Sequence, residues 1–310
     1  MSQLPGDTSL PLFVYGALKP GEISWPLLEP FADSHETARL DDFSIYLIDG
    51  MPMAKHSQGK SLSGHIVTLK NPMEAYRAIA AFENVGEYYL WQTVVVDHAY
   101  ANALVAITGE KNKGVQLDYW STEHDPYFAQ LIPMVFEKIS PLRTILRGSS
   151  LGWDAEYIRA FLEVQSLYLL LWAMLERLYL FRVGYSDKKL KDKVDHIQQL
   201  DEWRKAFNAA EIVTKRPAQT HSQVRHPRHE SEEPTGFADW LKVRNNIAHR
   251  GKGNQNEVKF LLRITIDMHN TLAILLQEIS PSVRDLWLEL TNTKKQEHTG
   301  RLYVIQQKGR

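Results

Sequence analysis

Near its N-terminus the chain reads Phe13-Val14-Tyr15-Gly16-Ala17-Leu18-Lys19-Pro20-Gly21, a short apolar run that leads into a turn rich in Gly and Pro. The apolar residues at the start of this stretch favour a β-strand, and the glycines and the proline predict the turn that ends it. A glycine turn can leave backbone N–H groups exposed, and these can hold a carboxylate or a carbonyl of a small substrate. The stretch therefore predicts a strand and, after it, a glycine turn that can hold such a group.

A second stretch combines the end of a predicted helix with an acidic residue. It reads Ala81-Phe82-Glu83-Asn84-Val85-Gly86 and continues with Tyr89, Trp91 and the apolar run Val94 to Val96. Together with the Tyr-Gly-x-Leu pattern of the first stretch, these motifs stand in the order found in the γ-glutamylcyclotransferase and AIG2-like family. Residues 10 to 112 resemble that family, which implies a mixed, barrel-like β domain. The resemblance also implies that Tyr15, Gly16, Ala17 and Leu18 form a binding loop.

The resemblance implies a chemical role for Glu83. This residue would be the general base that removes a proton from a substrate amine and returns it to the leaving amine. Partial burial among Phe82, Val85 and Tyr89 would raise the pKa of its carboxyl group, which suits this role. The chain departs from many relatives at Trp91, where they carry a basic residue, so substrate identity and a sensing role stay open. In the alternative interpretation, Glu83 is only a helix-end carboxylate and the loop is a simple turn.

The first third of the chain has the pattern of an α+β or barrel-like fold. Up to about residue 110, short β-rich runs are separated by turns that contain Gly, Pro or Asp. One helix is expected over Pro72 to Phe82. The strands are expected over residues 12–15, 43–48, 65–69, 93–96 and 103–107.

From about residue 154 the pattern becomes helical. A long apolar segment reaches Val183, a stripe at helical spacing runs from Leu190 to Phe207, and another helix is expected over Val258 to Ile279. Prolines and a Gly-Ser cluster predict that residues 116–153 form a connector ending in a flexible joint. We therefore predict an N-terminal γ-glutamylcyclotransferase-like domain (1–115), the connector (116–153) and an all-α domain (154–310).

The helical part contains Trp240-Leu241-Lys242-Val243-Arg244-Asn245-Asn246-Ile247-Ala248-His249. Cutting RNA without a metal needs a base of near-neutral pKa to take the 2′-hydroxyl proton, and a fixed cation to hold the charge that grows on the phosphate. His249 and Arg244 are groups of these two kinds. Elsewhere in this part, Arg263 is expected to pair with Asp267 on a polar stripe of the predicted helix.

This Arg-polar-x3-His pattern within a helical region resembles the HEPN superfamily over residues 150 to 310. The resemblance implies an all-α HEPN bundle that acts as a metal-independent endoribonuclease. His249 would activate the 2′-hydroxyl, Arg244 would stabilise the transition state, and Asn245 would orient one of them or contact phosphate. Two protomers would form a homodimer whose two motifs line one cleft, and the cut RNA would end in 2′,3′-cyclic phosphates.

Such an activity implies a toxin or an antiviral defence effector, with tRNA or mRNA as the RNA partner. An antitoxin or another regulatory protein would restrain it, and the N-terminal domain would serve as a sensor, regulator or modifier. The irregular segment Lys215 to Thr235, which is rich in basic residues and His, is either a basic arm along RNA phosphates or a solvated loop.

The sequence favours this ribonuclease over two alternatives. The first is a γ-glutamyl amine-cleaving enzyme that uses Glu83, with a helical part that only dimerises. The second is a non-catalytic module that binds RNA or protein. Arg244 and His249 could also do no more than cap a helix end, where cations are favoured.

Composition excludes several other classes of function. A formal net charge of −1 over 310 residues gives no general attraction to nucleic acid, and the absence of cysteine excludes disulfides and thiolate catalysis. No phosphate-binding glycine loop and no hydrolase or metalloprotease motif is found, so we expect no cofactor and no metal. The start of the chain does not read as a signal peptide, and the apolar run Leu167 to Leu175 is too short to cross a bilayer. We therefore expect a cytoplasmic protein with no membrane partner.

Overall fold

The chain forms two compact units. The computed structural model describes residues 4–48, 51–107, 115–148, 154–184, 189–210, 236–250 and 255–293. The N-terminal unit consists of residues 1–126, 178–187 and 279–283, and the helical unit consists of residues 127–177, 188–278 and 284–310. Each unit is described by itself below.

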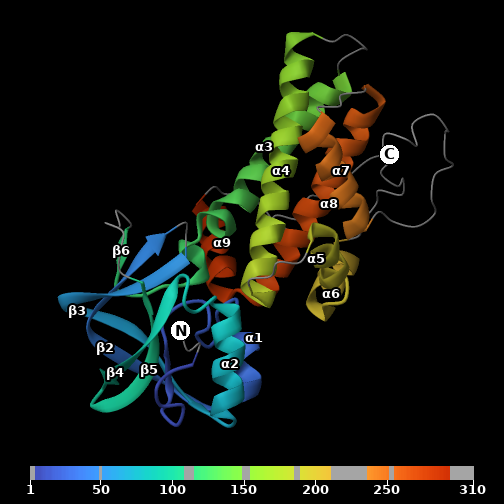
Figure 1. The fold of residues 1–310 in the computed structure, drawn as a ribbon. Helices are drawn as coiled ribbons and strands as arrows, with labels where there is room; N and C mark the ends of the chain where they lie inside the picture. Colours follow the sequence, from blue (N-terminus) through green and yellow to red (C-terminus); the bar gives the residue numbers. More distant parts are fainter. Residues whose placement is uncertain are drawn as a thin grey trace. The chain divides into compact units, whose positions relative to one another are not determined.

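The N-terminal unit is built on a mixed sheet (Figure 1). The sheet has six strands in the order β4-β5-β1-β3-β2-β6. β1 runs parallel to β5, and the other neighbouring strands are antiparallel. The strands are β1 (Leu12–Val14), β2 (Ala32–Ile48), β3 (Met51–Leu69), β4 (Tyr89–Val96), β5 (Ala99–Ala106) and β6 (Gln116–Leu117).

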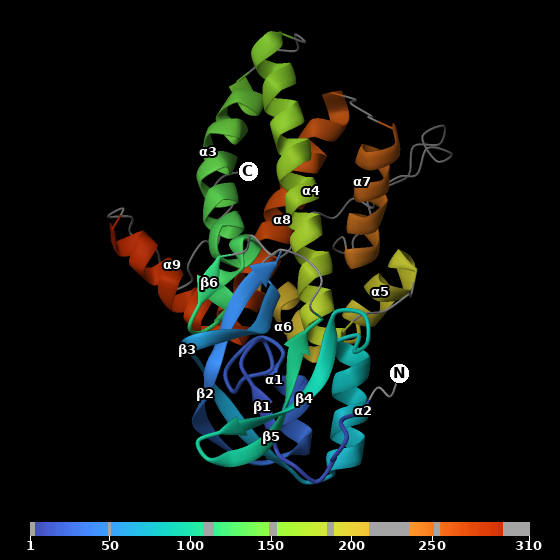
Figure 2. The same ribbon diagram turned by 60° about the vertical axis from the view of Figure 1, so that its left-hand side comes forward.

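This sheet curls toward a barrel. The backbone N–H of Arg39 in β2 donates a hydrogen bond to Asp97 Oδ2, 3.1 Å away in the turn between β4 and β5. Asp97 and His98 have φ angles of 45° and 73°, as a tight two-residue hairpin turn requires. The contact joins strands that are not neighbours in the sheet order, and Figure 2 shows the long β2–β3 hairpin curving past the β4–β5 hairpin. The α+β class expected from the sequence is confirmed for this unit.

One helix, α2 (Pro72–Phe82), covers the core of the N-terminal unit and has the bounds that the sequence predicts. Pro72 suits the first turn because its missing N–H would have no partner there. The buried face of the helix holds Ala75, Tyr76, Ile79 and Ala80, which pack in one cluster with apolar side chains of the sheet. The short α1 (Trp25–Leu28) and the 3-10 turn η1 (Glu29–Phe31) lie against the same cluster.

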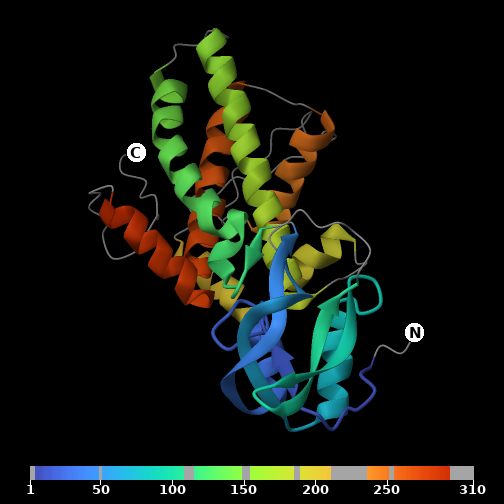
Figure 3. The same ribbon diagram turned by 90° about the vertical axis from the view of Figure 1, so that its left-hand side faces the viewer.

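The helical unit consists of helices in the part of the chain that the structure describes (Figure 3). α3 and α4 run side by side, and Lys138 Nζ lies 3.3 Å from Glu163 Oε1 between them. Trp203, Phe237 and Trp240 form an aromatic cluster whose Phe237 and Trp240 ring centroids are 4.7 Å apart. The helices are α3 (Ile132–Gly148), α4 (Ala155–Val183), α5 (Leu190–Ile197), α6 (Asp201–Ala209), α7 (Phe237–Arg250), α8 (Gln255–Ile279) and α9 (Pro281–Thr293). Of these, the last residues of α4 and a few at the α8–α9 junction belong to the N-terminal unit.

Residues 116–153, which we expected to form a connector, contain regular structure. β6, the 3-10 turn η2 (Thr122–His124), the π-helical turn η3 (Tyr127–Leu131) and α3 all lie in this range. Pro133 falls in the first turn of α3, where a proline is tolerated, and Pro141 lies inside the helix without ending it. Of the predicted joint at residues 147–152, Arg147 and Gly148 are the last residues of α3, and the rest lies outside the described residues, as does the segment Lys215 to Thr235.

Two further expectations for the helical unit differ from the structure. The stripe from Leu190 to Phe207 belongs to α5 and α6 rather than to one helix. Arg263 is exposed while Asp267 is buried, and no ion pair joins them among the described residues.

Among the described residues, α4 is the one helix long and apolar enough to cross a membrane. It extends well beyond the run Leu167 to Leu175 that we judged too short. This is weak evidence for a membrane span, because 56% of its most apolar window is buried inside the structure, as in a core helix.

Candidate active site

The predicted binding loop follows β1 directly and has a fixed path. The N–H of Lys19 donates to Gly16 O at 3.1 Å, and the N–H of Ser24 donates to Ala17 O at 2.9 Å. Gly16 packs so tightly on Pro52 of β3 that a Cβ atom on this residue would lie 2.7 Å from Pro52 Cγ. A larger residue at this position would therefore displace the loop or Pro52.

The residues that follow the binding loop are anchored to the segment after β6. Glu22 Oε2 accepts hydrogen bonds from the N–H of Thr122 at 2.9 Å and from its hydroxyl at 2.7 Å. Lys19 Nζ donates to the carbonyl of Trp120. Burial lowers the pKa of Lys19, and the nearby charge of Glu22 opposes this change. These contacts hold the loop in place independently of any ligand.

Three consecutive backbone donors in the loop are unused. Among the residues that the structure describes, no acceptor bonds to the N–H groups of Gly16, Ala17 and Leu18. Backbone N–H groups that succeed one another around a turn can together hold an anionic or carbonyl oxygen. The loop can therefore bind such an oxygen.

Glu83 lies at the C-terminal end of α2, where its N–H donates to Ile79 O at 2.8 Å. The residues after it turn sharply, with positive φ at Asn84 (49°) and Gly86 (99°). Burial raises the pKa of Glu83 from 4.5 to about 7. The side chain is half-buried, and its carboxylate has no hydrogen-bond partner among the described residues. A carboxyl group with a pKa near 7 can both take and return a proton at neutral pH.

Two buried tyrosines lie near this carboxylate. Tyr15 donates its hydroxyl hydrogen to Leu104 O at 2.6 Å, and Tyr89 donates to Pro52 O at 3.1 Å. Burial raises the pKa of each phenol, and the negative charge of Glu83 adds to both increases. The structure thus places Glu83 near Tyr15 of the predicted binding loop. It also adds the hydroxyl of Tyr89, which the sequence marked only as an apolar neighbour.

Trp91 has a packing role. Its ring meets Tyr76 edge to face with centroids 5.2 Å apart, and it packs against the core cluster of the unit. Tyr76 in turn donates to Leu10 O at 2.7 Å and accepts from Asn102 Nδ2 at 3.0 Å. Trp91 therefore helps to hold α2 against the sheet.

The second predicted site lies on α7 of the helical unit. Arg244 is half-buried, Asn245 is exposed, and Arg244 Nη1 donates to Asn245 Oδ1 at 3.2 Å. α7 continues to Arg250, so positions 244 and 249 lie about 140° apart around one uninterrupted helix. The side chain of His249 lies outside the described residues. The two positions do not share a face of the helix.

Among the described residues, no group of three or more His, Asp or Glu side chains gathers as metal ligands would. The polar groups of the N-terminal site are a carboxylate, two phenols and backbone donors. Such a set suits proton transfer and the binding of an oxygen.

Comparison with known proteins identifies the N-terminal part. Residues 12–122 match the model of the family described as gamma-glutamyl cyclotransferase, AIG2-like. The N-terminal part of this chain is therefore a cyclotransferase-like, AIG2-like domain. The match ends at residue 122, before the helical unit begins.

Two solved structures are similar to this chain. One is the crystal structure of an uncharacterized protein from Pyrococcus horikoshii, with 19% identity, a TM-score of 0.31, and coverage of 37% of this chain and 91% of that chain. The other is a solution structure from Arabidopsis thaliana, with 18% identity, a TM-score of 0.29, and coverage of 50% of this chain and 99% of that chain. A search of curated proteins gives no match.

Proposed function

We propose that the N-terminal unit is a γ-glutamylcyclotransferase-like enzyme in which Glu83 is the general base. The observation that carries this proposal is the half-buried carboxyl of Glu83, with a pKa of about 7, near a loop with unused backbone donors. The family match over residues 12–122 supports the same reading. This reaction was the alternative to the ribonuclease in the sequence analysis, and the observed geometry favours it.

The chemistry follows from the groups present. In a γ-glutamyl amide, the α-amine can reach the γ-carbonyl and close a five-membered lactam. Glu83 takes a proton from the α-ammonium, and the freed amine attacks the carbonyl carbon. The N–H groups of Gly16, Ala17 and Leu18 hold the oxygen that becomes negative. Glu83 returns its proton to the leaving nitrogen of the tetrahedral intermediate, and the C–N bond to that nitrogen breaks as the carbonyl reforms. The attacking nitrogen, now part of the lactam, gives up its second proton through Glu83 to the departing amine, which leaves as an ammonium ion.

The test is incubation of the full-length protein with a panel of γ-glutamyl amides, with the lactam and the free amine detected by mass spectrometry. We expect turnover by the wild type and by Glu74→Gln, a control that removes an exposed carboxylate from the first turn of α2. Glu83→Gln should form lactam at least about a hundredfold more slowly. Equal turnover by Glu83→Gln and the wild type would refute the assignment of the base.

A second candidate function is the HEPN-type endoribonuclease, which we propose for the helical unit. It rests on the Arg-polar-x3-His pattern of Arg244, Asn245 and His249 on α7, where Arg244 Nη1 donates to Asn245 Oδ1 at 3.2 Å. Because positions 244 and 249 do not share a face, His249 would act with Arg244 across a homodimer. RNA would be the partner, and a toxin or defence role in the cytoplasm, restrained by an antitoxin, belongs to this proposal.

This candidate is tested with total RNA and tRNA in excess EDTA. Cleavage that leaves 2′,3′-cyclic phosphate ends, and that is lost in His249→Ala but kept in Glu83→Gln, would support it. Intact RNA with the wild type at every salt concentration would reject it, leaving the helical unit as a dimerising or partner-binding module.

A further inference from the structure

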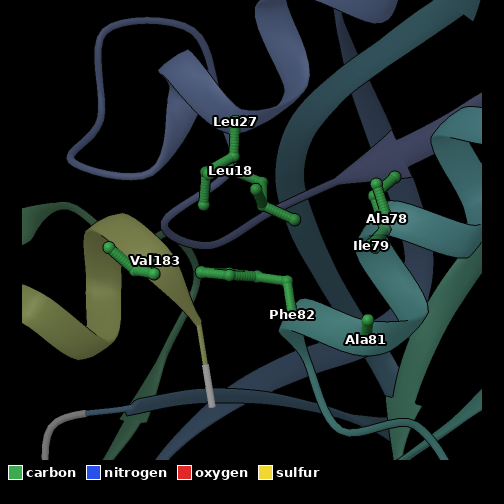
Figure 4. Close-up of a pocket in the computed structure, with 7 residues that line it drawn as sticks. All are labelled: Leu18, Leu27, Ala78, Ile79, Ala81, Phe82 and Val183. Atoms are coloured by element: carbon green, nitrogen blue, oxygen red, sulfur yellow. The ribbon is translucent and has the colours of Figure 1, made fainter. Parts of the chain in front are cut away.

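An apolar pocket lies beside the candidate active site, within the N-terminal unit. It has a volume of about 170 Å³. Figure 4 shows side chains from the binding loop, from α1, from α2 and from the end of α4 pointing toward it. Every side chain that lines it is apolar: Leu18, Leu27, Ala78, Ile79, Ala81, Phe82 and Val183.

Two of these residues connect the pocket to the catalytic groups. Leu18 is the last residue of the binding loop, so the residue that offers an unused N–H also forms part of the pocket wall. Phe82 immediately precedes Glu83 at the end of α2. A ligand held by the loop near Glu83 therefore has an apolar space next to it.

One side of the pocket is formed by a residue that lies outside the family match. Val183 is the last residue of α4, in the part of that helix that belongs to the N-terminal unit. Two hydrogen bonds hold this helix end: Ser24 Oγ donates to Phe181 O at 2.5 Å, and Arg182 Nη1 donates to Ile23 O at 2.8 Å. The ring of Phe181 also stacks on Trp120, with centroids 6.3 Å apart and planes 18° apart.

The chain just after Val183 is fitted closely to α2. Gly184 has a φ of +88°, and a Cβ atom on it would lie 2.7 Å from Phe82 Cδ2 and 3.1 Å from Phe82 Cα. Only glycine combines this backbone conformation with such a close approach. Contacts of the residues just before and just after Val183 thus hold this side of the pocket in place.

We infer that this pocket receives the side chain of the leaving amine, and that the preferred substrates are γ-glutamyl amides of amino acids with branched aliphatic or aromatic side chains. The inference rests on the proposed function of the same site. An apolar cavity of about 150 Å³ is large enough to hold a benzene ring. A charged lysine side chain would lose hydration there and find no polar side chain in the wall.

The pocket is first tested without catalysis, by titrating the full-length protein with indole in a calorimeter. We expect saturable binding to one site. Val183→Phe, which fills the pocket, should weaken it at least tenfold, and Ala81→Leu, which fills it from α2, should do the same. Val95→Phe is the matched control because Val95 is exposed on β4. Absence of indole binding, or equal binding by wild type and both filled variants, overturns the inference.

The substrate class is tested by comparing kcat/KM for γ-glutamyl-phenylalanine, γ-glutamyl-alanine and γ-glutamyl-lysine. The wild type should prefer phenylalanine at least tenfold over both others, and Val183→Phe should remove the preference while Val95→Phe keeps it. A wild type that turns over all three equally overturns the inference and leaves the proposed function standing. Indole binding without turnover of any γ-glutamyl amide refutes the proposed function and this substrate assignment, and shows that the cavity serves another apolar ligand.

Discussion

Two regions of the molecule shield polar groups from water, but they differ in whether those groups have hydrogen-bond partners. In the middle of α8, His269 is fully buried, with its ring nitrogens 3.1 Å from Ile132 O and from Asn270 Oδ1. Thr265 and Thr271 in the same helix donate to backbone carbonyls four residues earlier, at 2.7 Å and 2.9 Å. In the N-terminal site, by contrast, the Glu83 carboxylate and the loop donors have no partner among the described residues.

The difference separates a structural polar cluster from a candidate active site. Buried polar groups that bond to one another stabilise a unique packing, and losing one partner costs the desolvation of the other. Polar groups that stand close together without partners do nothing for the fold and are available to a ligand. On this reasoning we propose a functional role for Glu83 and a structural role for His269, although burial shifts the pKa of both.

The largest expected effect comes from Glu83→Gln. This change removes the proton acceptor, so kcat/KM for γ-glutamyl amides should fall by about 10²–10⁴. The fold should tolerate the change. The amide stays uncharged, whereas the carboxyl of Glu83 becomes charged in a half-buried site when it loses its proton. Steady-state kinetics and urea unfolding at pH 8 check the two parts, with an unfolding free energy at least equal to that of the wild type. A variant that keeps its activity but unfolds easily would reverse the assignment.

His269→Leu should show the opposite combination. It removes the polar contacts of the ring with Ile132 O and Asn270 Oδ1 from the core of the helical unit, and we expect the free energy of unfolding to drop by about 2–4 kcal/mol. The kcat/KM of the N-terminal site should not change at a temperature where the protein stays folded. Arg263→Ala, on the exposed side of the same helix, is the control and should cost less than about 0.5 kcal/mol. Equal losses in the two variants would contradict a structural role for His269.

The sequence predicted the elements around the N-terminal candidate site well where the signals are local. The bounds of α2 follow from Pro72 at its start and from the turn after Phe82, and Glu83 is marked by its place at that end. The loop is marked by Gly16. The sequence could not show which loop N–H groups remain unused or how near the side chains of Tyr15 and Tyr89 lie to Glu83. Both depend on strands that are far apart in the chain.

Elements that depend on non-local pairing or unusual prolines were missed. The first part of β2, residues 32–42, is mostly polar and exposed, and it is a strand because it pairs with β3 rather than because of its own pattern. α3 was missed because Pro141 usually ends a helix. Val183 carries no signal at all, since only the tertiary structure places the end of α4 beside α2.

The dependence of stability on pH should distinguish the two buried groups by sign. The folded-state pKa of Glu83 rises from 4.5 to about 7, so its contribution is present below pH 4.5 and is lost as pH rises through 7. The pKa of His269 falls from 6.5 to about 4, so its contribution is present above pH 6.5 and is lost as pH falls through 4. Each slope is at most about 1.4 kcal/mol per pH unit.

Urea unfolding from pH 4 to pH 8 measures these slopes. Glu83→Gln should remove the loss of stability between pH 4.5 and 7, and His269→Leu should remove the gain between pH 4 and 6.5. Variants that both follow the wild-type curve, offset by a constant, would show that neither group titrates as inferred.

The smallest expected effect tests whether the loop donors are held in place. Gly16→Ala puts a Cβ atom 2.7 Å from Pro52 Cγ, whereas Gly6→Ala meets nothing within 4 Å and serves as the matched control. We expect Gly16→Ala to unfold with about 1 kcal/mol less free energy than Gly6→Ala, as overpacking costs. Because the loop or Pro52 must shift, the KM for γ-glutamyl amides should rise as well, while an α8 variant such as His269→Leu leaves it alone. If KM stayed constant while stability fell, the donors of the loop would not contact substrate, and the difference between the two regions would be one of packing only.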